Sequence, residues 1–481
     1  MKSPVYDVAV VGAGPAGLAA ALAAAESGVT VAIADAGVRP GGQYWRSPAP
    51  GAGAFRPHTL HHAWHRFTSA DARLDELAAA GRVTRLAEHH VWSVERTEAL
   101  WSAHCAVGAE PRRGDARRDV VIRARRLVLA TGAYDRQLPF PGWDLPGVMT
   151  AGGAQALLKG QLVVAGATAV VAGTGPFLLP VAVGLARYGA RVAAVAEANS
   201  PLAFARFPRA VLGASRKVGE AAEYAAALLR HRIPIRHRHV VIGAFGRDRL
   251  EGVRVARMGG DGRVLTGTER VIPCDVLAVG WGFTPQLELH LQLGCATRVD
   301  VDSSLVVRVD DDQRTSVEGV WAAGESTGVG GADLAFIEGE LAGHAAAASL
   351  AAAPRRPAGA LRKRRAALRA FAAAMHQVYP VPETLIDGCD DETIVCRCEE
   401  VTAGAIRHAV AELGATEPRT VKLLARPGMG WCQGRVCGFA TACMTARAGR
   451  RPVGEADLRA FAERPIAAPI PLGLLATPPE P

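Results

Sequence analysis

A glycine-rich turn between a short apolar strand and a helix occurs twice in this chain, and it constrains the fold more than any other feature. Near the amino end, an apolar strand leads into Gly12-Ala13-Gly14-Pro15-Ala16-Gly17, and an Ala-rich helix follows. Gly12 permits the turn, Gly14 lets the backbone approach a pyrophosphate, and Gly17 lets the helix pack on the strand. Asp35 ends the next apolar strand, where it can accept from ribose hydroxyls. We therefore expect a dinucleotide-binding βαβ unit here.

A second strand, turn and helix repeat this pattern at residues 168–197. The turn is Gly173-Thr174-Gly175-Pro176-Phe177-Leu178, in which Leu178 stands where Gly or Ala is usual. Gly173 and Gly175 can still approach a pyrophosphate, but Leu178 should push the helix from the strand or shift the turn. Glu197 closes the following strand and suits an unphosphorylated 2′-hydroxyl. The second unit is therefore a candidate site for NAD or another adenine nucleotide, and the alternative is a nucleotide domain kept as a scaffold.

Three further segments favour FAD in the first unit. Thr131-Gly132 follows an apolar strand, and Gly324-Glu325 precedes a Gly-rich turn at 328–331. Both resemble the secondary fingerprints of flavoproteins with two dinucleotide-binding domains, in which an acid, usually Asp, holds the ribityl chain. Gly42-Gln43 fits the loop that passes near the isoalloxazine in that superfamily. The resemblance covers residues 5–350 and implies bound FAD, with the contact at Glu325 displaced by one methylene.

Disulfide reductases of the same build place a redox-active cysteine pair on the flavin. This chain has no cysteine before Cys105, and Cys274 and Cys295 are isolated in the sequence. Disulfide reduction is therefore not expected.

Four cysteines near the carboxyl end have the spacing of ligands to one metal centre: Cys396, Cys398, Cys432 and Cys437. Thiolates favour both zinc and iron-sulfur clusters, but structural zinc usually uses wider cysteine pairs at both ends. The first pair here has a single intervening residue, so we expect a 2Fe-2S cluster and keep zinc as the alternative. Arginines in the same segment can offset the negative charge of a thiolate-ligated cluster, namely Arg397, Arg426 and Arg435.

The net charge of +9 is concentrated in one stretch and does not mark a nucleic-acid-binding module. Between residues 351 and 385 the only acid is Glu383, and the basic residues are Arg355, Arg356, Arg362, Lys363, Arg364, Arg365 and Arg369. We interpret this stretch as a linker with one helix whose basic face is solvated, and the alternative is a role in partner docking. No nucleic-acid partner is expected.

The cysteine content and the apolar runs indicate the compartment. An odd number of cysteines, nine, in a large chain without an export signal favours a reducing environment. The apolar run 8–25 is better explained as strand, turn and helix than as a signal sequence, and no other run is long enough to span a bilayer. We expect a cytoplasmic protein without a transmembrane segment, and peripheral attachment to the inner face of the membrane stays open.

The order of these motifs predicts an α/β chain in which one Rossmann-like domain interrupts another, followed by a small helical 2Fe-2S domain. The expected divisions are 1–160 and 286–350 for the FAD domain, 161–285 for the NAD-type domain, 351–389 for the basic linker, 390–450 for the 2Fe-2S domain and 451–481 for the tail. The tail is Pro-rich after Ile466 and is expected to be loose.

Residues 394–438 resemble the 2Fe-2S domain of the bacterioferritin-associated ferredoxin type, through Cys396-Arg397-Cys398-Glu399 and Gly428-Met429-Gly430-Trp431-Cys432-Gln433-Gly434-Arg435-Val436-Cys437. Together with residues 130–143, they make the chain similar to the α-type subunits of amine-oxidising flavoprotein complexes. That group includes subunits of opine oxidase, hydrogen cyanide synthase, and proline or hydroxyproline dehydrogenase.

This resemblance implies a division of labour between subunits. A glycine- or sarcosine-oxidase-like flavoprotein β subunit oxidises an amino acid or secondary amine, and this chain forwards the electrons to a quinone or other acceptor. A small ferredoxin-like subunit is a further candidate partner. The motifs of this chain offer no acid-base pair to which we assign catalysis. Tyr134 and Arg136 are candidates for substrate or partner contact, or they pack the domain junction.

Two other functions stay open at this point. The first is a self-sufficient NADH:acceptor oxidoreductase, in which NAD at Gly173 and Gly175 reduces FAD. The second is not catalytic: a scaffold or redox-sensing subunit in which the cluster controls assembly.

Overall fold

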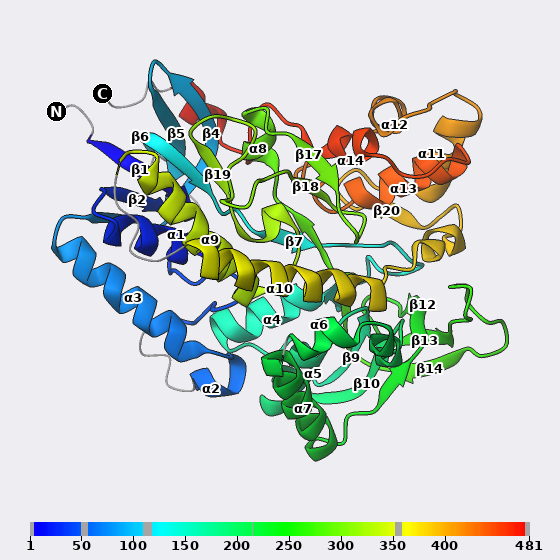
Figure 1. Cartoon of the computed structure of the whole chain (residues 1–481). Helices are drawn as coiled ribbons and strands as arrows, with labels where there is room; N and C mark the ends of the chain where they lie inside the picture. Colours follow the sequence, from blue (N-terminus) through cyan, green and yellow to red (C-terminus); the bar gives the residue numbers. More distant parts are fainter. Residues whose placement is uncertain (1–3, 50–55, 109–117, 214, 352–357, 477–481) are drawn as a thin grey trace.

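Two sheets organise the first 350 residues, and each contains the strand that leads into one of the glycine-rich turns (Figure 1). The computed structural model describes residues 4–49, 56–108, 118–213, 215–351 and 358–476. The first sheet has the order β3-β2-β1-β6-β5-β4, and β19 also pairs with β6. Its strands are β1 (Val5–Val11), β2 (Val31–Ala34), β3 (Val83–Leu86), β4 (His89–Thr97), β5 (Leu100–Val107), β6 (Arg118–Leu129) and β19 (Val320–Ala322).

The first sheet is parallel around β1 and becomes antiparallel beyond β6. β1 pairs in parallel with β2 and β6, and β19 pairs in parallel with β6, whereas β4, β5 and β6 form an antiparallel ribbon. Because β19 joins this sheet after the whole second unit, the chain returns to the first unit as the sequence predicts. The ends of β1, β6 and β19 therefore lie at one edge, where parallel sheets bind ligands.

Helix α1 (Pro15–Glu26) lies at the centre of the first unit. Pro15 is its first residue, which suits a position whose N–H needs no helical partner. α1 packs against α9 (Ala332–Ala348) and α3 (Trp64–Ala79), and nine of its twelve residues are buried. This burial explains why α1 is apolar all round and has no amphipathic pattern.

The second sheet is parallel, with the order β11-β10-β9-β15-β8. Its strands are β8 (Val148–Thr150), β9 (Thr168–Gly173), β10 (Arg191–Glu197), β11 (Ile235–His237) and β15 (Val276–Gly280). The helices of this unit are α4 (Ala151–Gln161), α5 (Leu178–Arg187), α6 (Pro208–Leu212) and α7 (Ser215–Arg230). Because β8 pairs with β15, this sheet includes a strand that precedes the predicted boundary at residue 161.

Smaller sheets connect these units. An antiparallel sheet of β12 (His239–Phe245), β13 (Gly252–Arg257) and β14 (Arg270–Pro273) extends the second unit. β7 (Ala133–Asp135) pairs with β16 (Phe283–Pro285) where the chain leaves and re-enters the first unit. The remaining elements before the cysteine segment are α2 (Pro57–Leu60), α8 (Glu288–Gln292), β17 (Thr297–Val299) and β18 (Leu305–Val307), with 3-10 turns η1 (Pro201–Arg206), η2 (Gly324–Thr327) and η3 (Glu383–Gly388).

Helix α10 (Ala358–Val378) crosses the molecule between the two nucleotide units (Figure 1). It contacts α9 of the first unit and also η1 and α6 of the second. The cysteine segment then folds into a small unit made of β20 (Ile394–Cys396), β21 (Val401–Thr402), α11 (Ala403–Ala411), α12 (Pro418–Ala425), α13 (Gly438–Ala448) and α14 (Glu455–Ala462). Among the described helices, none is both long enough and apolar enough to cross a bilayer.

The prediction of a loose tail after Ile466 is wrong for the residues that follow it directly. Ala467 and Ala468 are buried, and the Ala467 N–H donates to the Trp92 carbonyl at 2.7 Å. Arg435 donates to the Ala467 carbonyl. A short helix, α15 (Leu472–Ala476), ends the described chain. The tail therefore joins β4 to the cysteine unit, while residues 477–481 lie outside the described residues.

Candidate functional site

The first glycine-rich turn is held by the acid that follows β2. The Ala13 N–H donates to Asp35 Oδ2 at 2.5 Å, and the Gly37 N–H donates to Oδ1 at 2.7 Å. Burial raises the pKa of Asp35, and these two amides oppose the rise. Asp35 thus fixes the turn itself, and it also lines the adjoining cavity, where the sequence predicts its contact with ribose.

One cavity of about 2320 Å³ joins most of the predicted site residues. Fourteen of them line it, namely Gly12, Gly14, Pro15, Ala16, Asp35, Gly42, Gln43, Thr131, Gly132, Gly175, Glu197, Gly324, Glu325 and Cys432. The other predicted residues, Gly17, Gly173, Cys396, Cys398 and Cys437, are not in its wall. The cavity therefore runs from the first fingerprint past the second and reaches one of the four cysteines. Cofactor contacts at these residues remain predictions.

Glu325 gives the cavity an unsatisfied acceptor. Its Oε1 accepts from the Gly331 N–H at 3.0 Å, whereas its Oε2 is buried and has no hydrogen-bond partner among the described residues. Burial raises the pKa of Glu325 to about 7. A buried acceptor normally has a partner, and a ribityl hydroxyl in the cavity would provide one. The residues present therefore fit FAD at this position.

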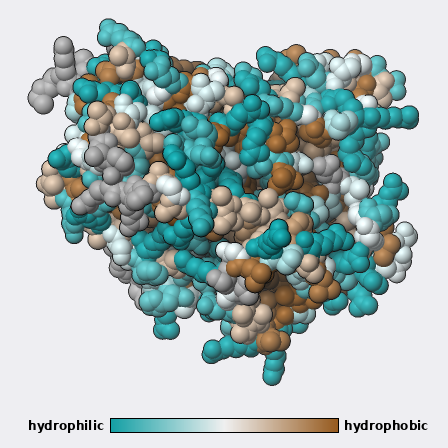
Figure 2. Space-filling view, in the orientation of Figure 1, coloured by the Kyte–Doolittle hydropathy of each residue, from teal (hydrophilic) through white to brown (hydrophobic). Residues whose placement is uncertain are grey.

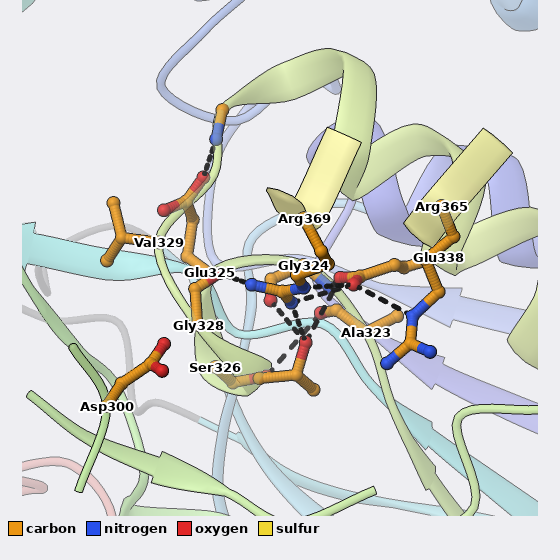
Figure 3. Close-up of polar contacts among 12 residues, drawn as sticks. Asp300, Ala323, Gly324, Glu325, Ser326, Gly328, Val329, Glu338, Arg365 and Arg369 are labelled. Carbon is orange, nitrogen blue, oxygen red and sulfur yellow. Dashed lines mark hydrogen bonds and ion pairs between the residues drawn. The ribbon is translucent and has the colours of Figure 1, made fainter. Parts of the chain in front are cut away.

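The segment that carries Glu325 is clamped by a network that sequence reasoning missed (Figure 3). Glu338 of α9 is fully buried and accepts from the Gly324 N–H at 3.2 Å and the Thr327 hydroxyl at 3.0 Å. Arg369 of α10 approaches Glu338 Oε1 to 2.7 Å, and Arg365 approaches it to 3.3 Å. Arg369 also donates to the Gly328 carbonyl at 2.7 Å.

The expectation of a solvated basic face on α10 is therefore wrong for Arg365 and Arg369. Both side chains are largely buried and pair with Glu338, next to the segment that carries Glu325. A spacing of four between two arginines could have indicated one helix face, but it could not identify Glu338 as the partner. Arg355 and Arg356 of the same basic stretch lie outside the described residues.

The second glycine-rich turn is held in the same way by Glu197. The Gly175 N–H donates to Glu197 Oε2 at 2.8 Å, and the Thr174 hydroxyl and the Asn199 N–H donate to Oε1. Burial raises the pKa of Glu197 to about 7. The turn is shifted, as predicted, because α5 begins at Leu178 itself and Leu178 is buried in the core.

Aromatic side chains enclose the cavity beside the second turn. Phe371 of α10 stacks on Phe204, with ring centroids 6.2 Å apart, and Tyr379 meets Phe204 edge-on. The Asn199 side chain donates to the Pro380 carbonyl at 2.9 Å and so joins the end of the α10 segment to the second turn. Figure 2 shows an apolar area on the surface around α6 and α7. The exposed apolar side chains of this region are Leu202 of η1, Leu212 of α6 and Leu229 of α7.

The four predicted metal ligands come together as two pairs. Cys396 lies beside Cys437, and Cys398 beside Cys432, and in each pair the second thiol shifts the pKa of the first. The Gly428 N–H donates to Cys396 Sγ at 3.4 Å, and the neighbouring Cys437 thiol is the main cause that lowers the pKa of Cys396 to about 6. A 2Fe-2S cluster uses two thiolates on each iron, so two thiol pairs fit it. Among the described residues, no three Cys, His, Asp or Glu side chains are grouped as ligands of a single ion.

A chain of hydrogen bonds connects the segment after Thr131-Gly132 to the cysteine unit. Tyr134, three residues after Thr131, accepts from Arg435 Nε at 2.8 Å, and Arg435 Nη1 donates to the Cys432 carbonyl at 3.3 Å. Burial and the neighbouring Glu288 raise the pKa of Tyr134. Arg136 packs the junction instead, because it is buried, pairs with Asp302 at 3.1 Å and lies over the Phe439 ring.

All nine cysteines lie in the described ranges, and none of them forms a disulfide. Cys105, Cys274 and Cys295 are buried and do not pair with one another, and burial raises the pKa of Cys105 and Cys274 to about 12. Buried thiols of high pKa are poor nucleophiles, so these three do not provide a disulfide-reductase centre.

Two family models match the chain. The pyridine nucleotide-disulphide oxidoreductase model covers residues 6–352, and the BFD-like 2Fe-2S binding domain model covers residues 394–442. An opine oxidase subunit from Agrobacterium tumefaciens is 35% identical over 98% of this chain and 92% of its own length. Hydrogen cyanide synthase subunit HcnB of Pseudomonas aeruginosa is 31% identical over 92% of this chain and 94% of its own length.

A solved structure shares the whole fold. The L-proline dehydrogenase from P. horikoshii superposes with a TM-score of 0.68 at 20% identity, covering 98% of this chain and 80% of that one. These matches confirm the resemblance to α-type subunits and the nested α/β fold with a helical 2Fe-2S domain. The chain therefore belongs to the pyridine nucleotide-disulphide oxidoreductase family and is an FAD-dependent oxidoreductase that carries a BFD-like 2Fe-2S binding domain at residues 394–442.

Proposed function

We propose that this chain is the electron-transferring subunit of a dehydrogenase complex that oxidises an amino acid or a secondary amine of the opine, proline, hydroxyproline or glycine class. The observation that carries the proposal is the continuity of one cavity from the first glycine-rich turn and Glu325 to Cys432. FAD accepts two electrons and a 2Fe-2S cluster carries one, so the two groups together convert one kind of transfer into the other.

The chain's own residues have three tasks in this proposal. Asp35 binds the ribose of FAD and the first turn binds its pyrophosphate. Glu325 binds the ribityl chain through its unsatisfied oxygen. Cys396, Cys398, Cys432 and Cys437 hold the cluster. The hydrogen bonds from Tyr134 through Arg435 fix the distance between the segment after Thr131-Gly132 and the Cys432 loop.

The partners follow from the relatives, which are named as subunits of larger enzymes. We propose a flavoprotein β subunit that contains the amine pocket, a downstream quinone or other acceptor and, as a further component, a small ferredoxin-like subunit. Nine cysteines without a disulfide among them support the cytoplasm as the compartment. Contact with the inner face of the membrane would come through the acceptor.

A second candidate is an NADH:acceptor oxidoreductase. Its support is that Gly175 and Glu197 of the second turn border the same cavity as the first fingerprint. In that case NADH would reduce FAD within this chain, and no amine-oxidising partner would be needed.

Anaerobic reduction of the purified chain distinguishes the two candidates. The chain is mixed either with NADH or with an amine and the co-expressed β subunit, and flavin absorbance and low-temperature EPR are recorded. We expect reduction only when the β subunit is present with its substrate. Rapid flavin bleaching by NADH alone would favour the second candidate. A Cys432→Ser chain that still delivers electrons to the acceptor at the normal rate would refute a role for the cluster in transfer.

A further inference from the structure

A buried charge cluster lies at the junction between the first unit and the cysteine unit. Its centre is Glu288 of α8, which is 5% exposed. Arg435 approaches Glu288 Oε1 to 2.9 Å, and Arg464 approaches the same oxygen to 2.6 Å. The Tyr134 hydroxyl donates to this oxygen at 3.2 Å. The cluster has two cations and one anion, so it is net positive.

Both cations contact the ligand loop: Arg464 Nε donates to the Gln433 carbonyl at 2.9 Å, and Arg435 lies within the loop itself. Arg435 stands three residues after Cys432 and two before Cys437, and Nη1 donates to the Cys432 carbonyl at 3.3 Å. Its side chain is 13% exposed, and Nε donates to Tyr134 at 2.8 Å. Because Tyr134 and Glu288 both come from the first unit, that unit fixes the guanidinium against the ligand loop.

A fixed, poorly solvated cation acts on a redox centre more strongly than an exposed one. Water and salt screen an exposed charge, whereas a buried charge keeps most of its field. Arg426 provides the contrast within the same unit, because its side chain is 65% exposed and is paired with Glu399. The potentials of iron-sulfur clusters depend on such charges and on solvent exposure.

We propose that Arg435 is a positioning residue that raises the reduction potential of the 2Fe-2S cluster, with Glu288 as the counterion that limits this effect. This inference rests on the proposed function only in that it requires the cluster. Reduction of the cluster converts one ferric ion to ferrous with an electron from reduced FAD, and it adds one negative charge without a proton. A neighbouring cation stabilises that added charge. The positive junction therefore favours transfer from the flavin to the cluster.

Redox titration of the purified full-length chain, followed by EPR of the reduced cluster, tests the proposal without turnover. Arg435→Gln should shift the midpoint potential to more negative values, and Arg435→Lys should restore most of the shift because it keeps the charge. Glu288→Gln should shift the potential in the opposite direction, since it removes the counterion. Arg426→Gln is the matched control and should shift it less than Arg435→Gln.

The opposite signs separate an electrostatic role from structural damage. If Arg435→Gln leaves the potential unchanged with the cluster intact, the proposal is wrong. If that variant loses its cluster, the sign of the Glu288→Gln shift decides: a positive shift supports the proposal, and a negative or absent shift overturns it. A wild-type chain with no 2Fe-2S signal would instead refute the proposed function, so the two failures are distinguishable.

Discussion

The two glycine-rich turns differ in how closely the following helix packs against the turn. In the first unit, α1 starts immediately after Gly14, and a Cβ on Gly17 would lie 1.7 Å from the Gly12 carbonyl oxygen. In the second unit, α5 starts only at Leu178, and the Leu178 side chain packs in the core of the domain. The later start of α5 makes room for a side chain that the first turn cannot accept.

The tight element that both turns share is the first glycine. A Cβ on Gly12 would lie 2.3 Å from the Ala130 carbonyl oxygen, and one on Gly173 would lie 1.8 Å from the Gly280 carbonyl oxygen. Both residues also have positive φ, +101° and +134°. The approach of a neighbouring strand is thus preserved in both units, whereas the contact between helix and turn is not. A departure from the fingerprint at its last position therefore does not indicate a damaged nucleotide domain.

Gly17→Ala should have the largest effect of the substitutions that test this comparison. The added methyl group would meet backbone atoms of Gly12, which cannot move without displacing the turn. We expect a loss of at least about 5 kcal/mol in the unfolding free energy, together with loss of bound flavin. Urea unfolding of the apoprotein measures the first and absorbance the second.

Gly14→Ala is the matched control for this substitution. A Cβ on Gly14 would meet only Gly42 Cα, at 3.8 Å, which is an ordinary contact. The apoprotein should keep nearly its normal stability, while flavin binding should weaken because the backbone can no longer approach a pyrophosphate. Equal stabilities of Gly17→Ala and wild type would contradict the account of the first turn.

Leu178→Ala tests the second turn in the opposite direction. Ala matches the usual fingerprint better than Leu, so a damaged fingerprint should be repaired by this change. The buried position predicts instead a loss of about 2–5 kcal/mol, because the change leaves a cavity in the core. Chemical denaturation measures it, with Leu212→Ala on the exposed surface as a control that should change stability by less than about 0.5 kcal/mol. A gain in stability would show that Leu178 strains the turn.

The sequence was informative where one residue type has one physical use. Glycines between a strand and a helix predicted both turns, because only glycine allows such close approach. The spacing of four cysteines predicted which thiols come together, because few centres use that pattern. The glycine beside Glu325 indicated that acid as a candidate, and its contact with a cofactor stays a prediction. Each of these predictions needed only local geometry.

The sequence was less informative where the same residue type suits several environments. Arginines on a helix are typical of a solvated face, so α10 gave no sign that Arg369 meets the buried Glu338. Strand β8 has only three residues, too few for a periodic pattern, and the domain boundary was therefore placed too late. Residues 467–468 are buried because Ala467 is hydrogen-bonded to Arg435 and to Trp92, which are distant in the sequence.

Arg369→Gln tests another difference between the units, namely how their acidic residues are held. The Glu325 segment depends on α10, whereas Glu197 is held by its own turn. Removing the Arg369 charge leaves the buried Glu338 with Arg365 as its cation, at a cost of about 1–3 kcal/mol. The thermal unfolding temperature and the content of bound flavin should both fall. Arg362 lies on the same helix and forms an exposed ion pair, so Arg362→Gln should change neither quantity by much. Comparable losses in both variants would contradict the role of Arg369 in holding the Glu325 segment.

Glu197→Gln should have the smallest effect, and one that depends on pH. Burial raises the pKa of Glu197 to about 7 in the folded chain, against 4.5 as its ordinary value. Between these values the folded state holds the proton more tightly than the unfolded state, so the stabilisation is complete below pH 4.5 and is lost as the pH rises to 7. Wild type should lose about 1 kcal/mol of unfolding free energy between pH 5.5 and 6.5 through this group. Glu197→Gln should lack that loss, whereas Glu223→Gln, at an exposed site, should keep it. Parallel pH profiles for wild type and Glu197→Gln would mean that the second turn does not bury a titrating acid.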